Sequence, residues 1–148
     1  MPYFTYDTSV IISRRLVVSP KLPGNFRLSS VVLMELMASG TDDSQRKAYE
    51  ELFRGYQKEK LLIIPNEDDW LMASKVLYWL TQGRRRSGAG KLRRLERGVS
   101  QRMALDALLA ASARRCKVSV VTENWRDFKL IQRFCNVKVF KAAEFFSI

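Results

Sequence analysis

Four acidic residues occupy positions where a carboxylate could do chemistry. Asp7 ends the strand-like segment YFTYD, and Asp127 follows the apolar segment KVSVVT. Glu35 is the only charged residue in VVLMELMA, and Asp106 is the only one in MALDALLAASA. A buried carboxylate without a partner is costly or takes up a proton, so acids in such surroundings normally have a cation or a partner. Gathered carboxylates suit Mg²⁺ or Mn²⁺, which prefer oxygen ligands and keep water for chemistry.

The chain contains no histidine, which excludes Ser-His-Asp and Cys-His triads and His-ligated zinc. Its 26 Lys and Arg against 15 Asp and Glu give a formal net charge of +11. Such a charge favours a polyanionic partner, and nucleic acid is preferred over an anionic membrane because no long cationic amphipathic helix is present. Carboxylates beside a basic surface therefore favour metal-assisted hydrolysis of a phosphodiester.

Residues 84–102, RRRSGAGKLRRLERGVSQR, form the most basic part of the chain. Dense arginine with serine and glycine neutralises phosphates without reading a base sequence. Two interpretations stay open for this Arg-rich loop or arm: an RNA contact and a solvated loop. The residues expected to contact RNA are Arg84, Arg85, Arg86, Lys91, Arg93 and Arg94. Other charge runs, such as Glu67 to Asp69, are expected to be solvated.

The elements that must position the four acids alternate between strands and helices. Strands are predicted at 3–7, 26–28, 61–65, 117–122 and 137–140, and helices at 9–19, 31–39, 42–60, 67–83, 103–115 and 125–134. Strands separated by helices imply a parallel sheet with helices on both faces, and sites in such folds form beyond the carboxyl ends of the strands. The length of 148 residues predicts one domain, 1–148.

Cysteine usage and the apolar segments bear on the compartment. Cys116 and Cys135 fit no metal-ligand spacing and are expected to be free thiols in a reducing environment. No run of 18 apolar residues is present, and the N-terminal segment lacks a basic region followed by an apolar one. We therefore predict a cytoplasmic protein with no membrane partner.

Four segments, in this order, resemble the four acidic motifs of the PIN domain. They are YDTSV (6–10), SSVVLMELM (29–37), LDALLAASA (105–113) and VVTENWRDFK (120–129). The likeness is closest to VapC-type toxins of bacterial and archaeal toxin-antitoxin pairs. It implies a Rossmann-like PIN-domain α/β/α sandwich with a central parallel sheet of four to five strands. Ser9 departs from the family pattern, which often has Asn there, and the Arg-rich segment is longer than in a minimal toxin.

The resemblance also implies roles for individual residues. Asp7, Glu35 and Asp106 would form the principal acidic triad, with Asp127 as the fourth acid, and all four would be catalytic and hold Mg²⁺ or Mn²⁺. The supporting polar residues are Thr8, Ser9, Thr122 and Asn124. Cleavage by a metal-activated water would leave a 5′-phosphate and a 3′-hydroxyl.

The function that these observations favour is a metal-dependent endoribonuclease, the toxin of a type II toxin-antitoxin pair. Its expected partners are RNA and a cognate antitoxin protein, and a homodimer stays open. The alternatives are a PIN-family RNA-processing nuclease without an antitoxin and a non-catalytic, basic nucleic-acid-binding protein. Trp125 stays open between packing and stacking on a base near the site.

Overall fold

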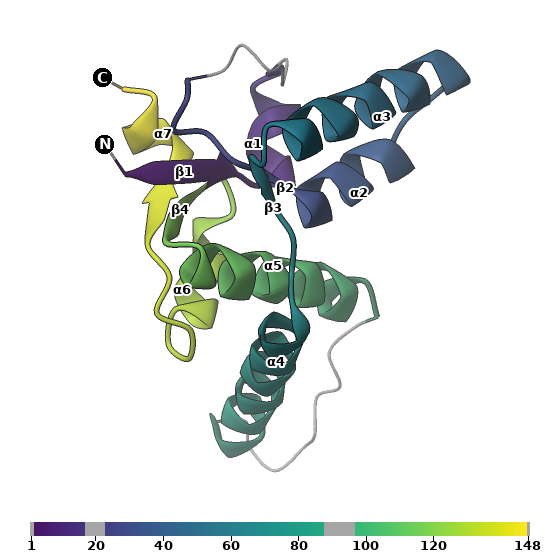
Figure 1. Cartoon of the computed structure of the whole chain (residues 1–148). Coiled ribbons are helices and arrows are strands. Elements are labelled where there is room, and N and C mark those ends of the chain that lie inside the picture. The colour runs from purple at the N-terminus through teal and green to yellow at the C-terminus, as the bar shows by residue number, and fades with distance from the viewer. Residues whose placement is uncertain (1, 17–22, 88–96, 148) are drawn as a thin grey trace.

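Strands and helices alternate along the chain in the computed structural model, which describes residues 2–16, 23–87 and 97–147 (Figure 1). The side-chain surroundings of residues 83–102 are not described. The elements are β1 (Tyr3–Tyr6), α1 (Thr8–Ser13), β2 (Leu28–Ser29), α2 (Ser30–Ala38), α3 (Asp43–Lys58), β3 (Leu62–Ile63), α4 (Glu67–Ser87), α5 (Arg97–Arg115), β4 (Val118–Thr122), α6 (Trp125–Ile131), β5 (Val139–Lys141) and α7 (Ala142–Phe145).

Every strand pair in the described part of the chain is parallel. β1, β4 and β5 form a three-stranded sheet, and β2 and β3 form a separate pair. A single parallel bridge between Phe4 and Phe26 joins them, which gives the strand order β3, β2, β1, β4, β5. The predicted parallel α/β fold is confirmed, but the main sheet has three strands rather than four to five. Because β2 and β3 have two residues each, they are too short to continue the ladder.

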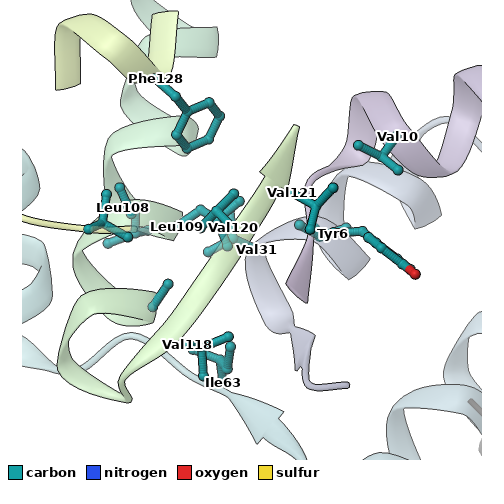
Figure 2. Packing of buried hydrophobic residues seen from close by; sticks show 14 of the residues in the cluster. Tyr6, Val10, Val31, Ile63, Leu108, Leu109, Val118, Val120, Val121 and Phe128 are labelled. Atoms are coloured by element: carbon teal, nitrogen blue, oxygen red, sulfur yellow. The ribbon is translucent and has the colours of Figure 1, made fainter. Parts of the chain in front are cut away.

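Helices cover both faces of the main sheet. Successive residues of a strand point to opposite faces, and in Figure 2 Val120 of β4 lies beside Leu109 of α5, whereas Val121 lies on the side of Tyr6 and Val10. All five residues of β4 are buried, in keeping with a strand covered on both sides. The core therefore extends on either side of β4. Packing on both faces fixes the position of the carboxyl end of this strand.

Polar side chains set the starts of two helices. The Ser29 hydroxyl accepts a hydrogen bond from Val31 N at 3.2 Å and begins α2. Asn66 Oδ1 accepts from Asp69 N at 2.9 Å, and Asp69 accepts in return from Asn66 N at 3.0 Å. The expectation that Asp69 is solvated is wrong, because it is buried and pairs with Arg115 Nε at 2.8 Å.

Two helices extend into the Arg-rich segment. α4 ends at Ser87 rather than at Gly83, and α5 begins at Arg97 rather than at Met103. Arginine is a good helix former, and one glycine inside a helix costs only about 1 kcal/mol, so Gly83 does not end α4. Part of the expected loop or arm is thus helical, and residues 88–96 lie outside the described residues. Helix α7 follows β5 and is not predicted from the sequence.

Candidate functional site

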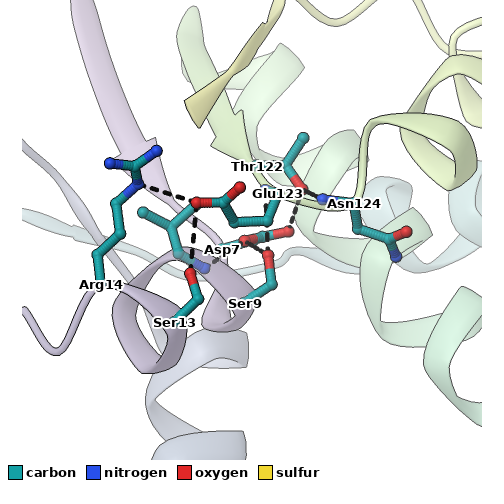
Figure 3. Close-up of polar contacts among 8 residues, drawn as sticks. Asp7, Ser9, Ser13, Arg14, Thr122, Glu123 and Asn124 are labelled. Carbon is teal, nitrogen blue, oxygen red and sulfur yellow. Dashed lines mark hydrogen bonds and ion pairs between the residues drawn. The ribbon is translucent and has the colours of Figure 1, made fainter. Parts of the chain in front are cut away.

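Asp7 lies at the carboxyl end of β1 and caps α1. Its carboxylate accepts hydrogen bonds from Val10 N at 3.2 Å and from the hydroxyls of Ser9 and Thr122, each at 2.5 Å (Figure 3). The residue is 3% exposed. Burial raises the pKa of Asp7, the three hydrogen bonds oppose that rise, and the negative charge of Glu123 adds to it. All three hydrogen-bond donors are neutral, so the Asp7 carboxylate is held by neutral hydrogen bonds and not by a salt bridge.

Glu35 approaches Asp7 from α2. Burial raises the pKa of Glu35 and the negative charge of Asp7 raises it further, while the nearby Thr8 hydroxyl lowers it. Thr8 Oγ1 is buried, and among the described residues it has no hydrogen-bond partner at normal distance. Buried polar atoms normally have a partner, which for a hydroxyl beside two carboxylates can be a water molecule.

Asn124 brings the other two predicted acids together. Its Nδ2 donates to Asp127 Oδ2 at 2.9 Å and lies 3.4 Å from Asp106 Oδ2. Asp106 lies in α5 and is 9% exposed, whereas Asp127 lies in the first turn of α6 and is half-buried. One amide group thus bridges carboxylates from two different helices.

Thr122 and Asn124 connect the two pairs of acids. The Thr122 hydroxyl donates to Asp7 and accepts from Asn124 N at 2.7 Å, and in Figure 3 the Asn124 side chain points away from Asp7. The strand order reverses between β1 and β4, so the site lies at the switch point where open parallel sheets bind ligands. The structure thus places all four acids at one edge of the sheet, as two pairs: Asp7 with Glu35, and Asp106 with Asp127.

These residues fit a hard divalent cation by their chemistry. They offer carboxylate, hydroxyl and amide oxygens, which Mg²⁺ and Mn²⁺ prefer, and the unpartnered Thr8 hydroxyl fits a water held by such an ion. Within the described residues, however, no three acidic or thiol side chains are close enough to form a complete metal-binding group. A cation at this edge would be held by Asp7 and Glu35 on one side and by Asp106 and Asp127 on the other.

A fifth acid at this edge, Glu123, is missed by the sequence reasoning. It directly follows Thr122, and its position after a strand end is the signal that could have found it. Its Oε1 pairs with Arg14 Nε at 2.9 Å and accepts from the Ser13 hydroxyl at 3.3 Å, and its N–H donates to Ser9 Oγ at 3.2 Å. Both side chains of the ion pair are about one-third exposed, so the pair contributes about 0–1 kcal/mol.

The predicted RNA-binding residues lie outside this description. Arg84, Arg85 and Arg86 belong to α4, but their side-chain surroundings are not described, and Lys91, Arg93 and Arg94 lie in 88–96. Among the described residues, no helix is long and apolar enough to cross a bilayer.

No protein-family model matches the chain, and no curated protein matches its sequence. Solved structures do match. The DNA-bound VapBC from Salmonella typhimurium is 17% identical and has a TM-score of 0.57, over 96% of this chain and 99% of that one. FitAB bound to an IR36 DNA fragment is 16% identical with a TM-score of 0.57, over 94% of this chain and 94% of that one. VapBC-1 from nontypeable Haemophilus influenzae is 20% identical with a TM-score of 0.54, over 95% of this chain and 98% of that one. The chain has the PIN-domain fold.

The PIN-domain fold confirms the resemblance seen in the four sequence motifs at the level of structure. In this fold Asp7, Glu35, Asp106 and Asp127 come from four separate elements and meet at one sheet edge. At 16–20% identity the PIN-domain likeness concerns the backbone, and the roles of individual side chains follow from their own contacts.

Proposed function

We propose that this protein is a metal-dependent endoribonuclease and the toxin of a toxin-antitoxin pair. The main observation behind the proposal is the arrangement of acids at the switch point. Asp7 and Glu35 form one pair, Asp106 and Asp127 form another, and Thr122 and Asn124 link the two pairs. The PIN-domain fold shared with VapBC and FitAB structures supports it. A net charge of +11 favours a polyanionic substrate, in agreement with RNA.

Each residue at the edge has a separate task in this proposal. Asp7, Glu35 and Asp106 would hold Mg²⁺ or Mn²⁺, and Thr122 keeps the Asp7 carboxylate in one orientation through its hydroxyl. When bound, the cation supplies charge that stabilises the scissile phosphate and lowers the pKa of a water. Asp127, fixed by Asn124, orients the attacking water. Attack by water without the ribose 2′-hydroxyl leaves a 5′-phosphate and a 3′-hydroxyl.

The partner proposed for this protein is a cognate antitoxin in the cytoplasm. The similar solved structures are the VapBC and FitAB complexes, two of them described as bound to DNA. A second candidate is a basic nucleic-acid-binding protein whose acids are structural. One observation favours it, namely that no three acidic or thiol side chains among the described residues form a complete metal-binding group.

The decisive experiment is cleavage of single-stranded and structured RNAs by the purified protein with Mn²⁺, Mg²⁺ or EDTA. We expect cleavage with either metal and none in EDTA, and products that carry a 5′-phosphate. Asp106→Asn should abolish cleavage, because the proposed metal site loses one of its carboxylates. Cleavage that persists unchanged in EDTA contradicts the metal mechanism. Tight RNA binding without cleavage under every condition supports the binding protein instead.

A further inference from the structure

A tryptophan and a lysine from different elements meet beside the acids. Lys141 ends β5 and is in register with Thr122 at the end of β4, so it lies at the same edge of the sheet one strand further along, about 4.8 Å away in backbone spacing. Trp125 follows Asn124 and begins α6. Lys141 Nζ lies 5.2 Å from the centroid of the Trp125 ring.

Trp125 is partly exposed, and the Lys141 ammonium lies over one face of its ring. The side chain is partly buried and packs against the core, whereas Lys141 is exposed. Because Lys141 is exposed, its ammonium stays hydrated and can leave the ring without losing a buried partner. The cation-π contact at such an exposed position is weak, and the lysine stem is flexible. A planar group can therefore replace the ammonium over the ring.

We propose that Trp125 and Lys141 bind one nucleotide of a single-stranded RNA next to the acids. The indole stacks on the base, and the ammonium moves from the ring to the adjoining phosphate. This inference rests on the proposed ribonuclease function. It assigns to Trp125 and Lys141 the nucleotide that lies beside the scissile bond at the carboxyl edge of the sheet. Every base has a π face, so the stacking is tolerant of base identity.

Charge at the edge supports this assignment. Asp7, Glu35, Asp106 and Asp127 repel a phosphate backbone, so a strand that crosses this edge needs a cation close by. Lys141 supplies one from the strand next to β4, at the end where the acids lie. Lys138 lies at the opposite end of β5, over the Phe140 ring at 5.4 Å, and has the same charge and exposure. It is therefore a matched control.

Fluorescence tests the stacking directly. Trp70→Phe with Trp79→Phe leaves Trp125 as the single tryptophan of the three in the chain. This protein is titrated in EDTA with a short RNA of mixed sequence and with an abasic strand of the same length. We expect RNA to quench Trp125 emission and the abasic strand to bind without quenching. Bound RNA that leaves the emission unchanged overturns the proposal, and so does the absence of any RNA binding.

Substitutions test the energetics. Trp125→Leu should weaken RNA binding about tenfold and Trp125→Phe less, because a base stacked on an aromatic ring contributes at about that level. Lys141→Gln should lower the log-log salt slope by about 0.7, the value for one single-strand phosphate contact, and Lys141→Arg should keep it. Lys138→Gln should leave the slope unchanged. Equal effects of Lys141→Gln and Lys138→Gln overturn the proposal. RNA that quenches but is never cleaved overturns only the ribonuclease function, and cleavage without quenching overturns only this nucleotide site.

Discussion

Asp7 is the most buried of the four predicted acids, and burial raises its pKa. It is buried, it caps α1, and its hydrogen bonds come from two hydroxyls and one amide. Burial raises its pKa, so the metal-free fold favours the protonated form more than the unfolded chain does. The same carboxylate that would bind a cation therefore destabilises the fold when the site is empty.

This cost predicts how stability depends on pH. A folded pKa above the unfolded value adds stability that is fully present below the unfolded pKa and is lost as pH rises through the folded pKa. In EDTA, Asp7→Asn should therefore raise the melting temperature at neutral pH by about 2–4 °C. The difference from the wild type should vanish as pH falls toward 4, about the unfolded pKa of Asp. Thermal denaturation across this range measures it. A variant that is less stable at neutral pH would show that the charged form is the one the fold prefers.

At the scale of elements, the connection between β4 and α6 determines the geometry. Thr122 ends the strand and Asn124 precedes the helix, and together they contact Asp7, Asp106 and Asp127. The Thr122 hydroxyl is fully buried, and it is at once a donor and an acceptor. A short connection thus contacts acids at the end of β1, in α5 and in α6.

Thr122→Val tests this connection, because valine keeps the shape and removes the hydroxyl. Asp7 loses a donor and Asn124 N loses an acceptor, so we expect unfolding to become easier by about 1–3 kcal/mol in urea denaturation. Mn²⁺ affinity, measured by calorimetry, should fall because Asp7 is no longer held. Thr122→Ser is the control, and it should keep the metal affinity of the wild type. Equal affinities for the valine and serine variants would show that the hydroxyl does not position Asp7.

The sequence predicts elements well where one chemical signal dominates. The apolar run of β4 appears as expected because local patterning is enough to specify it. The pairing of Asp106 with Asp127 through Asn124 depends on contacts between elements, which periodicity does not encode. Glu123 was passed over for the same reason, since its importance comes from its distant partner Arg14. The strands predicted at 26–28 and 61–65 are present as β2 and β3, but their short extents depend on tertiary pairing as well as on strand propensity.

At the scale of the whole molecule, charge is distributed unevenly. Residues 84–102 contain eight Arg or Lys and one Glu, a net +7, and the rest of the chain contributes +4 to the total of +11. Long-range attraction of the proposed RNA substrate would thus depend strongly on one segment, whereas the four acids lie outside residues 84–102. Affinity and catalysis are therefore expected to respond to different substitutions.

Replacing five arginines with glutamine tests this separation. The variant changes Arg84, Arg85, Arg86, Arg93 and Arg94. RNA affinity should fall for all sequences, with about 0.7 lost from the log-log salt slope per phosphate contact, while cleavage at saturating RNA changes little. A control of equal net charge changes Arg46, Lys47, Arg54, Lys58 and Lys60, in and just after α3. Equal slopes for the two variants would show that net charge alone, and not this segment, attracts RNA.

The hydrogen bond between Asp7 and Thr122 joins residues 115 positions apart, so the two residues are synthesised at different times. β1 is made before its partner β4, and the segment between the two strands must be synthesised before they can pair. Translation at about 5–20 residues per second places roughly 6–23 s between them. During that interval the first carboxylate has neither its strand partner nor the turn that orients it. A nascent chain therefore carries no assembled site until β4 and the turn that follows it have been made.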